Sequence, residues 1–269
     1  MKFIKMNNGL MIPVLGTGTN TYGKENNDFF AKITYDTKEL KSAIELGYRM
    51  IDTAIYYRNE AVIGKAVRES NIDRGEFFIT SKIPEKKEYT ETDESVKHHI
   101  EQSLKELDIE YIDLYLIHFP LSTNEDNVRV WRVLESFVEK GLLKSIGVSN
   151  FNEEQLSYLI QHANIKPVLN QFQSYPGKQQ QSLIDFCKAN DVIPEAYQSL
   201  AKLGPETKDQ LMELAKPYNK SWSQIILNYQ IHEGLVVIPK SHSKQHQFEN
   251  LDVFDFELTK EDIETIRNM

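Results

Sequence analysis

The sequence predicts a (β/α)8 TIM barrel with an N-terminal β-hairpin that closes the bottom of the barrel. Three observations favour this fold. Eight short apolar runs, typical of buried parallel strands, alternate with segments of helical periodicity. No Pro-, Gly- or Ser-rich linker interrupts this alternation, so we expect one domain over residues 1–269. The length of 269 residues also suits a barrel, which takes roughly 250 residues.

The hairpin is predicted over residues 3–13, where Asn8-Gly9 suits a tight turn between two short arms. The barrel strands are expected to follow at intervals that leave room for a helix between them. The eight predicted strands are Pro13–Leu15, Arg49–Ile51, Phe77–Thr80, Ile112–Ile117, Ser145–Val148, Pro167–Asn170, Val192–Ala196 and Leu235–Ile238.

The segments between these strands carry helix signals. Residues 36–39 resemble a capping box, and Gly47 suits the C-terminal end of the helix that follows. Two further segments place apolar side chains on one helical face. These side chains are Val96, Ile100, Leu104 and Leu107 in the first segment, and Trp131, Leu134, Val138 and Leu142 in the second.

Composition excludes several classes of function. A net charge of −9 argues against binding along a nucleic-acid backbone, which depends on Lys and Arg. The chain has one cysteine, Cys187, which lies at helical spacing among apolar residues and is interpreted as a core thiol. The N-terminal residues lack the apolar region of a signal peptide, and no apolar run is long enough to cross a membrane. We therefore expect a cytoplasmic protein, acting as a monomer, with no nucleic-acid or membrane partner.

Polar side chains stand at the carboxyl ends of most of the predicted strands. In a parallel barrel the carboxyl ends of the strands meet at one mouth, where active sites lie. Any one of these residues could be an ordinary ion pair or core side chain, but buried charges are rare unless paired or functional. The residues expected at this mouth are Asp52, Lys82, His118, Ser149, Asn150, Gln171, Tyr197 and Lys240, with Tyr57 shortly after Asp52.

This set suits proton delivery to a carbonyl oxygen. A free tyrosine titrates near 10, and a nearby ammonium such as Lys82 favours the phenolate and lowers the pKa of Tyr57. Asp52 would keep Lys82 charged, and His118 could direct a substrate oxygen by a hydrogen bond. The hydride that must reach the carbonyl carbon would come from a reduced nicotinamide, since no side chain can supply it.

Five segments carry a resemblance to a known family, in the same order along the chain. They are Gly47–Glu60, Ser81-Lys82, Asp113–Pro120, Gly147–Phe151, and Ile238–Ser241 followed by Glu249-Asn250. Together they resemble the signatures of the aldo-keto reductases, in particular the bacterial diketogluconic acid reductase-like and aldehyde reductase-like members. The resemblance covers residues 9 to 260, nearly the whole chain, and implies a TIM barrel that reduces aldehydes or ketones with NAD(P)H.

The resemblance also implies a role for each residue. Tyr57 would be the general acid, Lys82 and Asp52 its tuning pair, and His118 the residue that orients the substrate. The implied residues at the nicotinamide are Ser149, Asn150 and Gln171, which would bind the carboxamide, and Tyr197, which would stack on the ring. Ser199 and Leu200 would line the pyrophosphate, and Lys240, Ser241 and His246 would lie at the adenosine-side phosphate. Glu249 and Asn250 would contact the adenine, and Gly18 and Thr19 are also implied to bind the cofactor. No metal is implied.

Three departures from the family pattern leave the cofactor preference and the substrate open. His246 stands where the family often has an arginine for the NADP 2′-phosphate, and lacks its bidentate geometry. NADPH is favoured, with Lys240, Lys244 or His242 as phosphate ligands, and NADH is the competing cofactor.

The second and third departures concern the substrate pocket. The aromatic residues that the family often places around the substrate are absent from the corresponding positions of this chain. The long segment after the first strand could supply Tyr22, Phe29 and Phe30 as a substrate wall, or these rings could pack within it. The chain also ends soon after residue 262, so we expect an open pocket for many small carbonyl compounds.

Alternative interpretations are weaker. A doubly wound sheet lacks support because Gly16, Gly18 and Gly23 have the wrong spacing for a dinucleotide-binding fingerprint. A redox sensor that binds the cofactor but turns over slowly would not need the complete proton-donating set. A metal-dependent hydrolase using His98, His99 and His162 is disfavoured because adjacent helical side chains diverge by about 100°.

Overall fold

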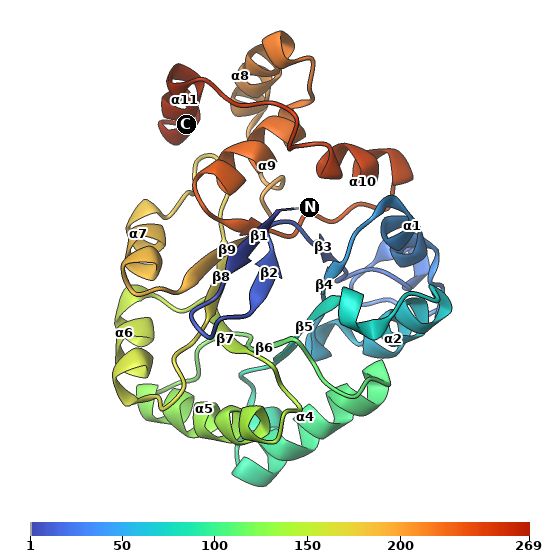
Figure 1. Ribbon diagram of the computed structural model, residues 1–269, viewed down its shortest axis with the longest axis vertical. Coiled ribbons are helices and arrows are strands. Elements are labelled where there is room, and N and C mark those ends of the chain that lie inside the picture. The colour runs from blue at the N-terminus through green and yellow to red at the C-terminus, as the bar shows by residue number, and fades with distance from the viewer. Residues whose placement is uncertain (1) are drawn as a thin grey trace.

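Eight parallel strands succeed one another around the barrel in chain order (Figure 1). The computed structural model describes residues 2–269. The barrel closes where Val237 N donates to Val14 O over 3.0 Å and Gly16 N donates to Val237 O over 2.9 Å. The strands are β3 (Thr17–Gly18), β4 (Met50–Asp52), β5 (Phe78–Ile83), β6 (Leu114–Ile117), β7 (Ile146–Ser149), β8 (Leu169–Gln173), β9 (Ile193–Tyr197) and β10 (Val236–Val237). The predicted (β/α)8 barrel is confirmed.

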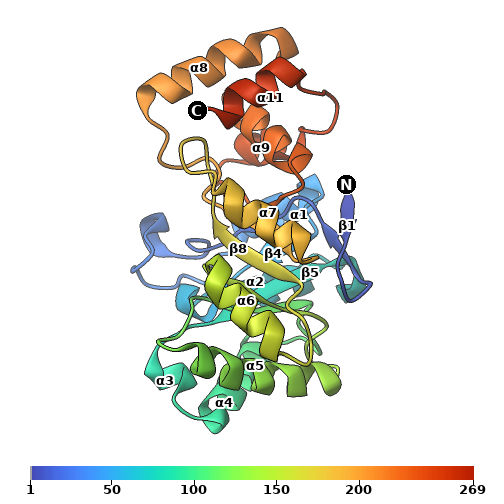
Figure 2. The ribbon, with the colours of Figure 1, turned by 90° about the vertical axis from the view of Figure 1, so that its left-hand side faces the viewer.

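Helices surround the sheet (Figure 1), and two of them, α8 and α11, pack together beyond the ring (Figure 2). The eleven α-helices of residues 2–269 are α1 (Lys38–Leu46), α2 (Glu60–Glu69), α3 (Lys87–Thr90), α4 (Asp93–Leu107), α5 (Asn124–Glu139), α6 (Glu153–His162), α7 (Gln181–Ala189), α8 (Pro205–Ala215), α9 (Trp222–His232), α10 (Lys244–Leu251) and α11 (Lys260–Arg267). None of these helices has both the length and the apolar character to cross a membrane.

An antiparallel hairpin closes the amino-terminal end of the barrel. It consists of β1 (Phe3–Lys5) and β2 (Met11–Pro13), with Ile4 paired to Ile12. Gly9 has a φ of +89°, which only glycine adopts easily, so the predicted turn position is confirmed. The Asn7 side-chain amide donates to the backbone oxygens of Pro167 and Asp191, which precede β8 and β9. The hairpin therefore lies at the bottom of the barrel, leaving the opposite end for a ligand.

Local packing explains how the helices are fixed. In α4, Val96, Ile100 and Leu107 are fully buried, and the Thr92 hydroxyl accepts from Ser95 N at the start of the helix. Gly64 of α2 lies so close to α4 that a Cβ would approach Leu107 O to 1.9 Å. This glycine therefore sets the separation of the two helices.

Two local predictions were wrong. The first barrel strand is displaced from residues 13–15, because Pro13 pairs in the hairpin; Val14 and Leu15 contact Val237 of β10, but β3 begins only at Thr17. The capping box at residues 36–39 also does not form. Asp36 accepts from Lys38 N over 3.0 Å, while the carboxylate of Glu39 contacts His242. The predicted end of α1 at Gly47 is confirmed, because Gly47 follows the helix with a φ of +109°.

Candidate active site

The carboxyl ends of the strands surround a cavity of about 530 Å³. It contains most of the residues that the sequence placed at one mouth. Its lining consists of Gly18, Thr19, Asn20, Asp52, Tyr57, His118, Phe119, Asn150, Gln171, Tyr197, Gln198, Ser199, Leu200, Ala201, Ile238, Pro239 and Lys240. Lys82 and Ser149 lie directly behind this lining, fully buried.

A buried ion pair forms the floor of the site. Lys82 Nζ lies 2.6 Å from Asp52 Oδ1 and donates to Thr53 O over 2.9 Å. Burial lowers the pKa of Lys82, but Asp52 and Tyr57 more than offset this effect, so its pKa is raised overall. Lys82 is therefore a permanent ammonium within a region that excludes water.

Tyr57 stands beside this pair, in a 3-10 turn over Ile55–Tyr57 that follows β4. Lys82 Nζ lies 5.1 Å from the centre of the Tyr57 ring. The prediction that Tyr57 has a lowered pKa was wrong for the net shift: burial raises the pKa of Tyr57, and the opposing effect of Lys82 does not cancel it. Tyr57 is therefore protonated at neutral pH, as a proton donor must be.

His118 faces the same space from the end of β6. Its ring centre is 5.8 Å from that of Tyr57, and it stacks on Phe119 at 5.0 Å. Burial, reinforced by the charge of Lys82, lowers the pKa of His118 well below its usual value. Its Nδ1 atom is buried without a hydrogen-bond partner among residues 2–269. The imidazole is therefore neutral and carries one N–H.

The ends of β7, β8 and β9 form a connected polar group. Ser149 Oγ donates to Gln171 O over 2.9 Å, and the Asn150 amide donates to Ser149 Oγ and to His118 O. Tyr197 OH donates to Asn150 Oδ1 over 2.8 Å. These contacts bring the predicted nicotinamide-binding residues together, although the donors and the acceptor of the Asn150 side chain are already engaged by the protein.

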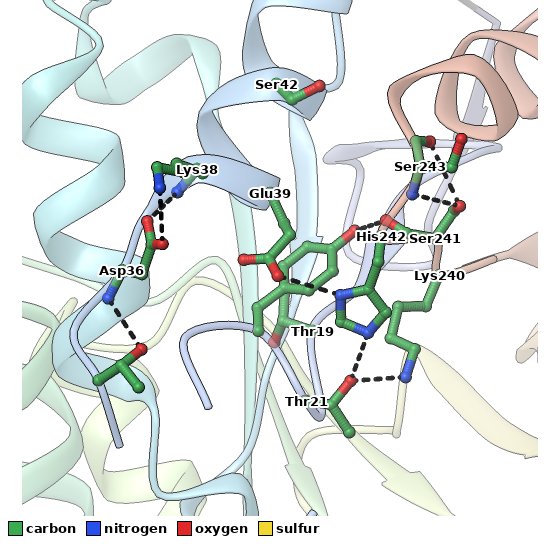
Figure 3. Close-up of polar contacts among 12 residues, drawn as sticks. Thr19, Thr21, Asp36, Lys38, Glu39, Ser42, Lys240, Ser241, His242 and Ser243 are labelled. Carbon is green, nitrogen blue, oxygen red and sulfur yellow. Dashed lines mark hydrogen bonds and ion pairs between the residues drawn. The ribbon is translucent and has the colours of Figure 1, made fainter. Parts of the chain in front are cut away.

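A second group of polar side chains lies where β10 ends, next to the segment that follows β3 (Figure 3). Thr21 Oγ1 accepts from Lys240 Nζ over 2.7 Å and lies 2.8 Å from His242 Nε2. His242 Nδ1 is 3.1 Å from Glu39 Oε1. Lys240 thus supplies a positive charge at the edge of the cavity, with His242 and the Glu39 carboxylate behind it. Thr21 and Glu39 were not identified from the sequence.

The remaining predicted phosphate and adenine residues lie outside this cavity. Ser241 Oγ contacts the start of α10, where the Ser243 hydroxyl accepts from His246 N. The His246 side chain is exposed, and Glu249 bonds to a neighbour within α10. Asn250 is buried at 3% exposure. Lys244 pairs with Glu45 of α1, away from Lys240.

Aromatic residues border the mouth. Phe29 approaches Tyr57 with ring centres 6.1 Å apart, whereas the side chain of Phe30 is 84% exposed. Tyr22 does not form a substrate wall, because it is buried and donates from its OH group to Ser241 O. Of the three rings considered from the sequence, Phe29 is therefore the one placed beside the candidate acid.

The sequence comparisons identify the family. The model of the Aldo/keto reductase family matches residues 14–269. A glyoxal reductase from Bacillus subtilis (strain 168) is 38% identical over 264 residues, covering 98% of this chain and 91% of that protein. A methylglyoxal reductase, DkgA, from Yersinia pestis is 36% identical over 268 residues, covering 99% of this chain and 92% of that protein. The chain belongs to the aldo/keto reductase family and is an NAD(P)H-dependent oxidoreductase.

Solved structures agree with this assignment. An aldo/keto reductase from Brucella melitensis superposes with a TM-score of 0.89 at 37% identity, covering 98% of both chains. An aldo-keto reductase from Bombyx mori in complex with NADP gives a TM-score of 0.87 at 34% identity, covering 99% of this chain and 92% of that one. The relatives support carbonyl reduction with a nicotinamide cofactor and do not favour a redox sensor.

Proposed function

We propose that the protein reduces small aldehydes and ketones to alcohols, with NADPH as the preferred cofactor and Tyr57 as the proton donor. One observation carries the proposal. A neutral Tyr57, a neutral His118 and the buried Lys82–Asp52 pair meet around one cavity. This combination donates a proton and stabilises negative charge, which is what a carbonyl oxygen requires as it is reduced.

Two features of the cavity support binding of a nicotinamide dinucleotide there. The Ser199 hydroxyl is buried, lines the cavity, and lacks a hydrogen-bond partner within the described part of the chain, so it can donate to a phosphate oxygen. Gly18 lets the chain pass close to β10, since a Cβ would lie 3.2 Å from Ile238 O. Lys240 would pair with the adenosine-side phosphate, Gln171 with the carboxamide, and Tyr197 with the nicotinamide ring. When bound, the reduced cofactor supplies the hydride.

The residues of this chain would then act in sequence on the carbonyl oxygen. His118 donates its N–H and fixes the direction of the oxygen. Tyr57 transfers its phenolic proton as negative charge develops there. Lys82, held charged by Asp52, stabilises the phenolate that remains. Burial of Lys82, Asp52 and His118 keeps water away from these three groups and strengthens their interactions.

NADPH preference is supported by relatives solved in complex with NADP and with NADPH. Lys240 supplies an ammonium at the mouth where β10 ends, and His242 lies behind it through the shared contact with Thr21. The Glu39 carboxylate works against the 2′-phosphate of NADPH, so NADH is proposed to remain usable, as the weaker cofactor. The ratio of kcat/KM for NADPH to that for NADH tests this, and a ratio below one overturns it.

A broad range of small carbonyl substrates is also proposed. Relatives named glyoxal reductase and methylglyoxal reductase point to α-oxoaldehydes among them. A panel of aldehydes, α-dicarbonyls, keto acids and sugars measures this range; reduction of a single compound would contradict it. Cytoplasmic location, a monomeric state and the absence of nucleic-acid partners stay predictions from the sequence.

Replacing Tyr57 tests the chemical proposal. Tyr57→Phe should lower kcat at least ~100-fold, because the proton donor is lost, while the Kd for NADPH stays within about twofold. Tyr56→Phe is the matched control, since Tyr56 also approaches the His118 ring, at 5.5 Å, but its hydroxyl bonds to Glu85. Turnover of Tyr57→Phe close to that of the control would remove Tyr57 as the acid.

A further inference from the structure

A carboxyl group not identified from the sequence lies beneath the cavity. Glu195 is on β9, in register with Gln171 on β8, and is fully buried. Its Oε1 atom accepts a hydrogen bond from Gln171 Nε2. Its Oε2 atom has no hydrogen-bond partner among residues 2–269. A buried carboxyl group with half of its hydrogen-bonding capacity unused destabilises a fold, so its presence calls for a function.

Glu195 controls how the Gln171 side chain is oriented. An amide nitrogen has two hydrogens, and both are used here. Gln171 Nε2 donates to Asp52 Oδ2 over 2.9 Å and also to Glu195 Oε1. Turning the amide over would place its oxygen against Asp52 Oδ2, which is unfavourable because both atoms are acceptors. The two carboxyl groups therefore direct Gln171 Oε1, which has no hydrogen-bond partner in the described structure, toward the cavity.

The remainder of Gln171 is held independently. Its backbone oxygen accepts from Ser149 Oγ over 2.9 Å and from Asn150 N over 2.8 Å. The main freedom left to Gln171 is rotation of its side chain, and the hydrogen bonds to Glu195 and Asp52 together restrict it. Burial raises the pKa of Glu195 to about 8, and the neighbouring charge of Asp52 adds to the rise. At neutral pH Glu195 thus acts as an uncharged acceptor and leaves the Lys82–Asp52 pair electrically balanced.

We propose that Glu195 is a positioning residue that presents Gln171 Oε1 to the N–H of the cofactor's carboxamide. This inference rests on the proposed function, since it assumes that the nicotinamide lies beside Gln171. It predicts that Glu195 contributes to recognition of the carboxamide group rather than to cofactor affinity in general. Replacing a residue that only supports the fold would weaken the binding of both cofactors by the same factor.

The test compares two cofactors that differ at this one group. In the reduced 3-acetylpyridine analogue of NADPH, a methyl group replaces the carboxamide NH2, so no N–H is available for Gln171. Dissociation constants for both cofactors are measured by calorimetry without a carbonyl substrate. The wild-type protein should prefer NADPH by about threefold to tenfold, the effect of one hydrogen bond.

Variants then separate the outcomes. Glu195→Leu should lose this preference, whereas Glu195→Gln, which can still accept from Gln171 Nε2, should retain it. Glu195→Met is measured alongside, so the test does not depend on the folding of one apolar variant. If the apolar variants keep the wild-type ratio, or weaken both cofactors equally, the inference is wrong. If the wild-type protein binds neither cofactor, the proposed function fails instead.

Discussion

The stability advantage of Glu195→Gln over the wild-type protein should grow as the pH rises. The pKa of Glu195 is raised by burial from 4.5 to about 8 in the folded protein. In the unfolded chain the carboxyl group ionises above 4.5, while in the folded protein it stays protonated until the pH approaches 8. Between these two values ionisation lowers the free energy of the unfolded chain but not that of the folded chain, so the wild-type protein loses stability with rising pH.

The size of this effect follows from the two pKa values. The unfolding free energy that the wild-type protein loses through Glu195 is below ~1 kcal/mol at pH 5 and reaches ~3 kcal/mol at pH 7, since each pKa unit corresponds to about 1.4 kcal/mol. Glutamine has nearly the same shape and does not ionise, so the Glu195→Gln variant does not lose this unfolding free energy. The difference in unfolding free energy between variant and wild type should therefore grow by ~2 kcal/mol or more from pH 5 to pH 7.

Urea denaturation at pH 5, 6, 7 and 8 measures this difference directly. Glu60→Gln is a matched comparison, because burial raises the pKa of Glu60 to about 7. The stability of Glu60→Gln relative to the wild-type protein should stop increasing near pH 7, about one pH unit before that of Glu195→Gln does. Parallel stability profiles for Glu195→Gln and the wild-type protein would refute the reasoning, because they would mean that the Glu195 carboxyl group ionises normally in the fold.

Three further predictions concern the cofactor, the substrate and the packing. His246→Arg should raise the NADPH/NADH ratio of kcat/KM about tenfold, by adding a charged hydrogen bond to the 2′-phosphate; an unchanged ratio would place the phosphate elsewhere. Phe29→Ala should raise KM for larger carbonyl substrates about threefold or more through loss of apolar contact, whereas Phe30→Ala, at an 84% exposed side chain, should not; equal KM values would exclude Phe29 from the substrate wall. Gly64→Ala should lower the unfolding free energy by ~3 kcal/mol in urea denaturation, because its Cβ would approach Leu107 O to 1.9 Å, while Gly75→Ala, with no atom nearby, should change it little.

The positions of Asp52, Lys82 and His118 could be predicted because parallel strands bring their carboxyl ends together. A polar residue at the end of an apolar run is visible in a single sequence, and the barrel then determines that such residues meet. Cys187 was likewise recognised as a core thiol from helical spacing, and it is fully buried. These predictions needed only periodicity and the order of the strands.

Other features depend on distances that no sequence pattern contains. The net pKa of Tyr57 is a balance between burial and the charge of Lys82, and its direction cannot be read from the presence of a nearby lysine. Glu195 did leave a signal, as a charged residue inside the predicted strand Val192–Ala196. Its partner Gln171 is 24 residues away, and their contact follows only from the register of β8 and β9.

The hairpin at the bottom of the barrel has a consequence for the order of folding. Its Asn7 side chain bonds to backbone oxygens 160 and 184 residues later in the chain. β1 and β2 can pair with each other early, but the hairpin can complete these contacts with the barrel only after Asp191 has been synthesised. Contacts of such long sequence separation form slowly, since a large loop must close first. Docking of β1 and β2 should accordingly be a late step of folding, which completes a barrel that the later strands have already shaped.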